Sequence, residues 1–102
     1  MEKYIKVYDW TVETGLNIEE RFVLSLIIQH TEGVYGGYWA GYKSMSERIG
    51  IPKSRCRAIV QKLKDIGAVE ETRKNILHQT RILLSAKPSF AAKFNKLAGA
   101  RV

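Results

Sequence analysis

The chain has 102 residues, of which 45% are hydrophobic and 26% are charged, a composition typical of one globular domain. No apolar stretch approaches the roughly 18 residues that a membrane span needs, and the N-terminus lacks the apolar core of a signal peptide. A single cysteine excludes an internal disulfide. We therefore expect a cytoplasmic protein without membrane contact.

The net charge of +7 is unevenly distributed along the chain. Residues 1–42 carry three basic and six acidic side chains, whereas residues 43–66 carry seven basic and two acidic ones. A basic protein favours a polyanionic partner, either a nucleic acid or an anionic membrane face. The position of the positive charge points to residues 43–66 as the segment that contacts this partner.

The first part of the chain predicts a strand, a helix and a loop. Residues 3–8 are rich in β-branched and aromatic side chains, which favours a short strand or an extended arm. Asn17 and Glu20 form a capping-box pattern, so a helix is expected from there to about Thr31. Residues 33–42 contain four glycines and four aromatic side chains, which predicts a loop with a short strand near residues 39–41. The expected buried stripe of the helix is Ile18, Phe22, Val23, Leu26 and Ile27, widened by Leu24 and Ile28.

Two closely spaced helices are expected next. Ser44 and Glu47 form a second capping box, which predicts a helix that ends at Gly50. After a turn at residues 51–52, a further helix is expected over residues 53–66. Its apolar side chains at helical spacing, expected to face inward, are Cys56, Ile59, Val60, Leu63 and Ile66.

A hairpin and a last helix complete the predicted elements. Residues 68–72 and 77–84 have the composition of strands, and the polar residues 73–75 between them suit a hairpin turn. Pro88 can open a helix. The apolar side chains of this helix, which must be buried against their own domain or against a second copy, are Phe90, Phe94 and Leu97.

The segment from Ser44 to Ile66 has the pattern of a helix-turn-helix, a motif whose second helix lies in the major groove of DNA. Small Ser46 lets the two helices approach closely, and Gly50 suits the left-handed conformation of the turn. Ile51 is expected to anchor the turn in the core. A hairpin directly after such a motif is typical of a winged helix.

Residues 43–72 resemble the winged helix-turn-helix domains of bacterial transcriptional regulators. With the preceding helix, they also resemble the N-terminal DNA-binding domains of plasmid and phage replication initiators. The similar features are Ile-Gly-Ile at residues 49–51, a polar helix start, and Leu-x-x-x-Gly from Leu63 into a strand. Pro52 and Cys56 depart from the pattern, in which a serine or threonine cap and a valine or isoleucine are usual.

The resemblance implies an α+β, mainly helical fold, with a three-helix core, a β-hairpin wing, an N-terminal strand or arm and a C-terminal helix. Residues 1–102 form a single domain in this prediction, with the helix-turn-helix at 44–67, the wing at 68–84 and the C-terminal helix at 88–98. The function expected is sequence-specific binding of double-stranded DNA, in the regulation of transcription or of plasmid or phage replication. A homodimer is also expected, through the C-terminal helix or the N-terminal segment, because many DNA readers are two-fold dimers.

Helical geometry predicts which side chains contact the DNA. Arg57 and Gln61 lie one turn apart and have planar groups suited to guanine and adenine edges. Small side chains beside them let the helix sit deep in the groove. The predicted reading face is Ser54, Arg57, Ala58 and Gln61, and the predicted phosphate contacts are Lys43, Lys53, Arg55, Lys62 and, on the wing, Arg73 and Lys74.

The alternative is a winged helix that binds another protein instead of DNA. In that case the aromatic loop and the C-terminal helix form the binding surface. The loop side chains either pack over the core beside the first helix or form an exposed patch; they are Tyr35, Tyr38, Trp39 and Tyr42.

Catalytic and metal sites are not expected. The sequence contains no recognisable catalytic triad, paired carboxylates or phosphate-binding glycine motif, so neither an enzyme activity nor a cofactor is predicted. Cys56 is expected to be a buried small hydrophobe. His30, expected at a helix end, and His78, expected in a wing strand, lack cysteine partners at ligand spacing.

Overall fold

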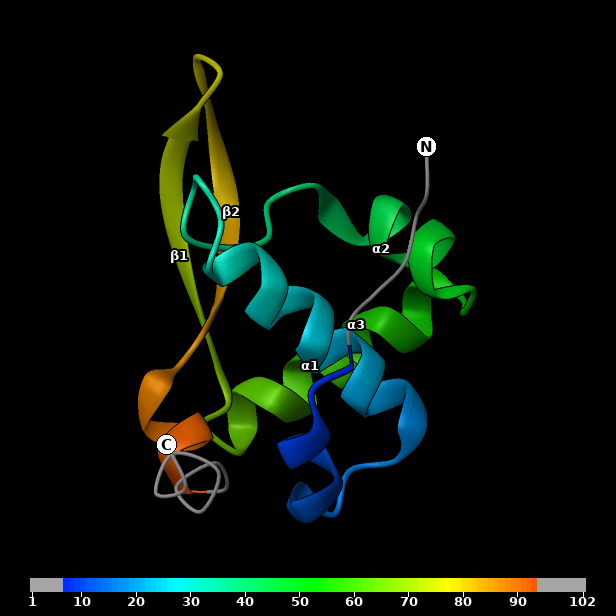
Figure 1. Ribbon diagram of the computed structural model, residues 1–102. Helices are drawn as coiled ribbons and strands as arrows, with labels where there is room; N and C mark the ends of the chain where they lie inside the picture. The colour runs from blue at the N-terminus through cyan, green and yellow to red at the C-terminus, as the bar shows by residue number, and fades with distance from the viewer. Residues whose placement is uncertain (1–6, 94–102) are drawn as a thin grey trace.

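The computed structural model describes residues 7–93, which form a helical body with one β-hairpin (Figure 1). Residues 88–93 are also helical. Residues 3–6 of the predicted arm and residues 94–98 of the predicted last helix lie outside the described residues, and residues 7–8 belong to no regular element. The elements in chain order are η1 (Asp9–Thr14, a 3-10 helix), α1 (Ile18–Thr31), α2 (Gly41–Ile49), α3 (Lys53–Asp65), β1 (Val69–Ile76) and β2 (Gln79–Ala86).

Helix α1 starts as the sequence predicts. The side chain of Asn17 accepts a hydrogen bond from the Glu20 N–H at 2.8 Å, and Glu20 Oε1 accepts one from the Asn17 N–H at 3.0 Å. In the first turn, Glu20 is buried whereas Ile18 is 52% exposed, so the prediction that Ile18 belongs to the buried stripe is wrong. The core residues of α1, each of which contributes about 1.5–3 kcal/mol by its burial, are Val23, Leu24, Leu26, Ile27 and Ile28.

The connection between α2 and α3 is a tight turn. Gly50 adopts the left-handed conformation, with φ of 87°, which a side chain at this position would strain. The Ser46 hydroxyl donates a hydrogen bond to the Ile51 carbonyl, so Ser46 fastens the turn as well as allowing close approach. The predicted capping box at Ser44 is wrong, because α2 begins three residues earlier, at Gly41, and no side chain caps it.

Helix α3 packs its apolar face inward. Cys56, Ile59, Val60 and Leu63 are buried, as predicted. Ile66 is 40% exposed and the prediction that it faces the core is wrong, because the helix ends at Asp65 and Ile66 leaves the inward stripe.

The turn of the hairpin lies further along the chain than predicted. Strands β1 and β2 pair in register from Val69 with Ala86 to Ile76 with Gln79, so the turn consists of Leu77 and His78. Both residues have positive φ, 54° and 66°, as a tight two-residue turn requires. The predictions of a turn at residues 73–75 and of His78 in a strand are wrong, because the ladder continues through the polar residues to the buried Ile76.

A third segment pairs with the hairpin at a single position. The N–H of Tyr38 donates to the Leu84 carbonyl at 2.7 Å, and the N–H of Leu84 donates to the Tyr38 carbonyl at 2.9 Å. The short strand predicted near residues 39–41 is therefore one bridge at Tyr38. The position before Tyr38 has room only for glycine, because a Cβ on Gly37 would lie 2.7 Å from the Leu84 carbonyl oxygen.

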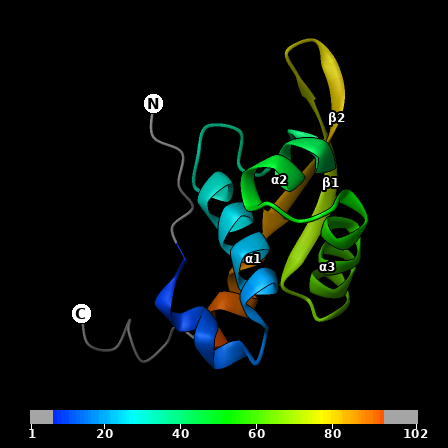
Figure 2. The ribbon, with the colours of Figure 1, turned by 90° about the vertical axis from the view of Figure 1, so that its right-hand side faces the viewer.

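The two ends of the described chain pack together below α1, as Figures 1 and 2 show. Trp10 in η1 lies against Phe90 in the helical residues 88–93, with 6.4 Å between ring centroids. Phe90 is buried, so this part of the chain is packed against its own domain. Among residues 7–93, no helix is long and apolar enough to cross a membrane.

Candidate nucleic-acid interface

The outward face of α3 is open along its length. Its side chains point away from the buried residues of the same helix, and in Figure 2 α3 lies at the right-hand edge of the molecule, with α1 to its left. All four residues of the predicted reading face are exposed: Ser54, Arg57, Ala58 and Gln61. Ser54 and Ala58 are small, so the surface of a partner can come close to the helix backbone at these positions.

The two long side chains of this face have different surroundings. The guanidinium carbon of Arg57 lies 5.4 Å from the centroid of the Tyr42 ring, within the range of a cation–π contact. Gln61 Nε2 donates a hydrogen bond to Asp65 Oδ1 at 2.9 Å. This bond engages one of the two amide N–H groups of Gln61, whereas Arg57 donates no hydrogen bond among residues 7–93.

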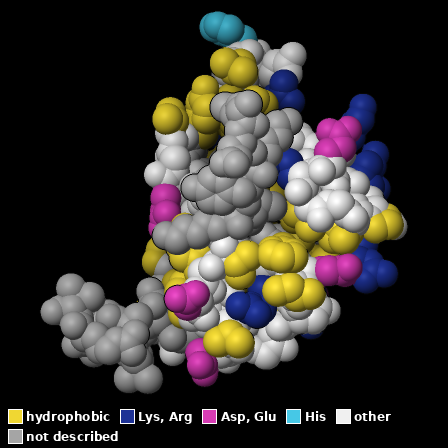
Figure 3. All heavy atoms as spheres, turned by 45° about the vertical axis from the view of Figure 1, so that its right-hand side comes forward, with side chains coloured by type: hydrophobic (Ala, Val, Ile, Leu, Met, Phe, Trp, Pro, Cys, Tyr) yellow, Lys and Arg dark blue, Asp and Glu magenta, His cyan; other side chains and the backbone are white. Residues whose placement is uncertain are grey.

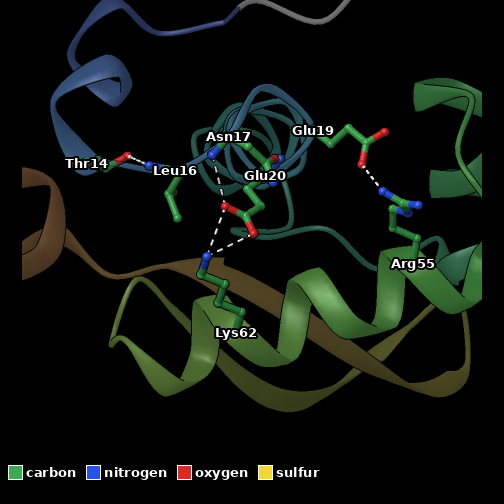
Figure 4. A network of polar contacts seen from close by, with 7 residues as sticks. All are labelled: Thr14, Leu16, Asn17, Glu19, Glu20, Arg55 and Lys62. Carbon is green, nitrogen blue, oxygen red and sulfur yellow. Dashed lines mark hydrogen bonds and ion pairs between the residues drawn. The ribbon is translucent and has the colours of Figure 1, made fainter.

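Two of the predicted phosphate contacts are committed to ion pairs with α1 (Figure 4). Arg55 Nη1 lies 2.8 Å from Glu19 Oε1, and Lys62 Nζ lies 3.0 Å from Glu20 Oε2. These pairs neutralise the side of α3 that faces α1. Arg55 and Lys62 therefore attach α3 to α1, and the paired carboxylates reduce the positive charge that they offer to a phosphate.

Glu20 connects the start of α1 to α3. Its side chain is 11% exposed and accepts hydrogen bonds from the Asn17 N–H and from Lys62 Nζ. Burial acts to raise the pKa of Glu20, but the Asn17 N–H and the Lys62 ammonium outweigh burial and leave the pKa below its ordinary value. The carboxylate is therefore charged in the folded protein at neutral pH.

The opposite side of α3, toward α2 and the hairpin, carries cations without carboxylate partners. Within the described part of the chain, Lys43 of α2 and Lys53 at the start of α3 form no ion pair, and both are exposed. Arg73 of β1 is likewise exposed and forms no ion pair among residues 7–93. Figure 3 shows Lys and Arg side chains gathered along one edge of the molecule. We call Lys43, Lys53, Arg57 and Arg73 the open basic surface.

The two predicted wing contacts, Arg73 and Lys74, lie on opposite faces of the hairpin. Glu71 accepts a hydrogen bond from Lys64 Nζ of α3 at 2.9 Å, so the Glu71 face of β1 is the one nearest α3. Arg73 lies two residues further along the same face, because alternate residues of a strand share a face. Lys74 lies on the other face, where its Nζ donates to the Tyr35 carbonyl at 3.1 Å. Only Arg73 belongs to the same side as α3.

The aromatic side chains near residues 33–42 pack against the protein's own elements. Tyr38 is 2% exposed, with the edge of its ring on His30 at a centroid distance of 5.1 Å. Trp39 lies under the Arg81 guanidinium at 5.2 Å, and the Tyr35 ring contacts Trp39 at 5.9 Å. Packing over the core, the first of the two alternatives for this loop, is therefore confirmed for Tyr38, and Tyr35, Trp39 and Tyr42 are half-buried.

Sequence reasoning missed the partners of the basic residues. Tyr42 was assigned to a loop, but it lies in the first turn of α2, where its ring reaches Arg57. The sequence pattern places Glu20 only in the capping box and indicates no role for Glu19. Their contacts with α3 span 36 and 42 residues of sequence, and no local pattern indicates such pairs.

The remaining reactive side chains are isolated from one another. Cys56 is fully buried, and burial raises the pKa of its thiol, which makes it less reactive. His30 lies at the end of α1, as predicted; burial and the nearby Arg48 lower its pKa. In the described part of the chain, no group of three or more His, Cys, Asp or Glu is arranged to hold a metal ion.

Comparisons with protein-family models, curated proteins and solved structures give no match. The partner of the open basic surface is therefore inferred from its residues and their geometry.

Proposed function

We propose that this protein is a winged helix-turn-helix protein that binds double-stranded DNA, with α3 in the major groove and the hairpin as its wing. The main observation in support is the outward face of α3. It combines small residues with an arginine whose donors form no hydrogen bond, and cations on one flank that form no ion pair, within residues 7–93. A major groove about 12 Å wide admits such a helix, and phosphates line its edges.

The chain path supports the same proposal. The left-handed Gly50 joins α2 to α3, and the hairpin follows α3 directly. The bridge between Tyr38 and Leu84 ties the segment before α2 to the hairpin. A helix-turn-helix with a hairpin after its second helix is the arrangement from which the winged helix takes its name.

The proposed contacts divide into two kinds. Arg57 donates a pair of hydrogen bonds to a guanine edge, and Ser54 and Ala58 allow the helix backbone to come close. Lys43, Lys53 and Arg73 contact phosphates, which supplies affinity but no sequence information. Asp65 lies on the outward face at the end of α3 and repels phosphates, so contacts concentrate in the first half of the helix.

The biological role follows from the resemblance of residues 43–72. A cytoplasmic, sequence-specific regulator of transcription, or of plasmid or phage replication, is the proposal that agrees with both the resemblance and the surface. The homodimer stays a prediction, because Phe94, Leu97 and residues 1–6 lie outside the described residues.

Single substitutions on α3 test the proposed roles. The preferred duplex is first selected from a random library with the wild-type protein. Dissociation constants for that duplex and for a scrambled one are then measured by fluorescence anisotropy. We expect Arg57→Ala to lose about 1–3 kcal/mol on the selected duplex only, and Lys53→Ala to weaken both duplexes alike.

Lys93→Ala is the matched control, because it removes an exposed lysine from residues 88–93, which lie near the C-terminal end of α3 and not near Lys53 at its start. This variant should bind both duplexes as the wild type does. Equal losses for Arg57→Ala and Lys53→Ala on both duplexes would show that α3 does not read bases with this face.

A further inference from the structure

Arg57 differs in its contacts from the other cations of α3, of which Lys53 forms no ion pair among residues 7–93 and the remaining three are paired with carboxylates. Arg55, Lys62 and Lys64 each donate to a carboxylate, at nitrogen–oxygen distances of 2.8 to 3.0 Å. Arg57 instead contacts the face of an aromatic ring. A ring face attracts the positive charge of a guanidinium without accepting hydrogen bonds from its N–H groups. Arg57 is thus restrained while its five donors stay available.

Tyr42 is itself held in a fixed place. It lies in the first turn of α2, half-buried, with its ring packed against the hydrophobic core. Burial raises the pKa of its hydroxyl, and the charged groups around it are the Lys64–Glu71 pair and Arg57. A ring with two rotatable bonds, packed on one side against the core, provides a rigid surface for the more mobile arginine.

We propose that Tyr42 is a positioning residue that sets the sequence specificity of this protein by holding Arg57 ready for a guanine edge. The inference rests on the proposed function. An arginine side chain loses rotamer freedom when it forms a bidentate contact, and a partner that restrains it beforehand reduces that loss. The benefit appears only where Arg57 reads a base, so Tyr42 contributes to discrimination between duplexes and not to general affinity for DNA.

The first experiment measures discrimination, the ratio of affinities for the library-selected and the scrambled duplex. A cation–π contact at an exposed site corresponds to about a two- to fivefold effect on an equilibrium constant. We expect Tyr42→Leu to lower the ratio by about that factor while the affinity for the scrambled duplex stays unchanged. Tyr42→Phe retains the ring and should retain the ratio.

A double variant tests whether Tyr42 acts through Arg57. In Arg57→Ala the ring has no guanidinium to hold, so adding Tyr42→Leu should cause no further loss of discrimination. A full additional loss in the double variant would mean that Tyr42 acts by another route. Equal weakening of both duplexes by Tyr42→Leu would mean that the residue supports only the fold.

Fluorinated phenylalanines at position 42 provide the test if Tyr42→Leu does not fold. One, two or three fluorine atoms weaken the negative ring face with little change in shape, so the discrimination ratio should fall stepwise with their number. A ratio that does not change across this series would overturn the proposal for Tyr42.

The outcomes for the wild type separate this inference from the proposed function. If the wild-type protein binds no duplex, the proposed function fails and the role of Tyr42 fails with it. If it binds all duplexes with equal affinity, DNA binding stands and the specificity role of Tyr42 is overturned. If it discriminates and the Tyr42 variants keep its ratio, only the inference about Tyr42 is contradicted.

Discussion

At the scale of single residues, Glu20 shows how one side chain serves both the fold and the candidate interface. Its carboxylate closes the capping box of α1 and accepts the ammonium of Lys62 from α3. The free energy of these contacts depends on the negative charge. Because they lower the pKa of Glu20 in the folded state, the charge stabilises the protein above the pKa of the unfolded chain. This contribution is lost as the pH falls through the folded-state pKa.

We therefore expect Glu20→Gln to destabilise the protein by about 1 kcal/mol at pH 7. The gap to the wild type should close as the pH falls through the lowered folded-state pKa of Glu20, since the wild-type carboxylate is protonated below it. Urea unfolding monitored by tryptophan fluorescence at several pH values measures this gap. Glu19→Gln is the matched control, because the exposed pair that Glu19 forms with Arg55 should contribute less than about 0.5 kcal/mol. A gap for Glu20→Gln that does not narrow as the protein is titrated with acid would exclude the charge as its cause.

At the scale of elements, the hairpin turn uses residues that are not the best for its geometry. Leu77 and His78 both have positive φ, where side chains with a Cβ are disfavoured, and Leu77 is 63% exposed. Asn-Gly is the pair best suited to such a turn. The double substitution Leu77→Asn with His78→Gly should raise the free energy of unfolding by about 1 kcal/mol. Thermal unfolding monitored by circular dichroism measures the change, and a lower melting temperature would contradict the assigned turn.

An element could be predicted from the sequence where the residues that determine it lie close together in the chain. The start of α1 could be predicted because Asn17 and Glu20 are three residues apart, and the turn before α3 because glycine is needed where φ is positive. The turn of the hairpin could not, because the polar residues 73–75 have turn-like composition. Their pairing is set by the strand register and by the burial of Ile76. Helix α2 likewise begins before its apparent capping box, at Gly41.

The candidate site was predictable only in part, for the same reason. The exposure of the four residues proposed to read DNA follows from the 3.6-residue period of α3, and all four are exposed in the structure. The division of the cations into paired and unpaired ones does not follow from that period. Arg55 and Lys62 pair with carboxylates of α1, and Arg57 contacts a tyrosine ring of α2. These contacts depend on how three helices pack.

At the scale of the whole molecule, the basic side chains on the two sides of α3 differ in whether carboxylates neutralise them. Toward α1, basic side chains are neutralised by Glu19 and Glu20. Toward α2 and the near face of the hairpin, the open basic surface has no such partners among residues 7–93. In the proposed function, a duplex is expected to approach α3 from the α2 side, with Arg73 of the hairpin beside it. Lys74, on the far face of the hairpin, takes no part in this approach.

The most direct test of this account is the salt dependence of binding to a random duplex, measured by fluorescence anisotropy. Each phosphate contact contributes about 0.9 to the slope of the logarithm of the association constant against the logarithm of salt concentration. The wild type should bind at ~50 mM salt with a slope of magnitude about 3 or more. The triple variant Lys43→Ala, Lys53→Ala, Arg73→Ala should lose nearly all of that slope.

The matched triple Lys74→Ala, Lys87→Ala, Lys93→Ala removes the same charge from outside the open basic surface, and it should keep the wild-type slope. The account predicts a clear difference between the two triple variants. No binding by the wild type at low salt, or equal slopes for the two triple variants, would contradict it.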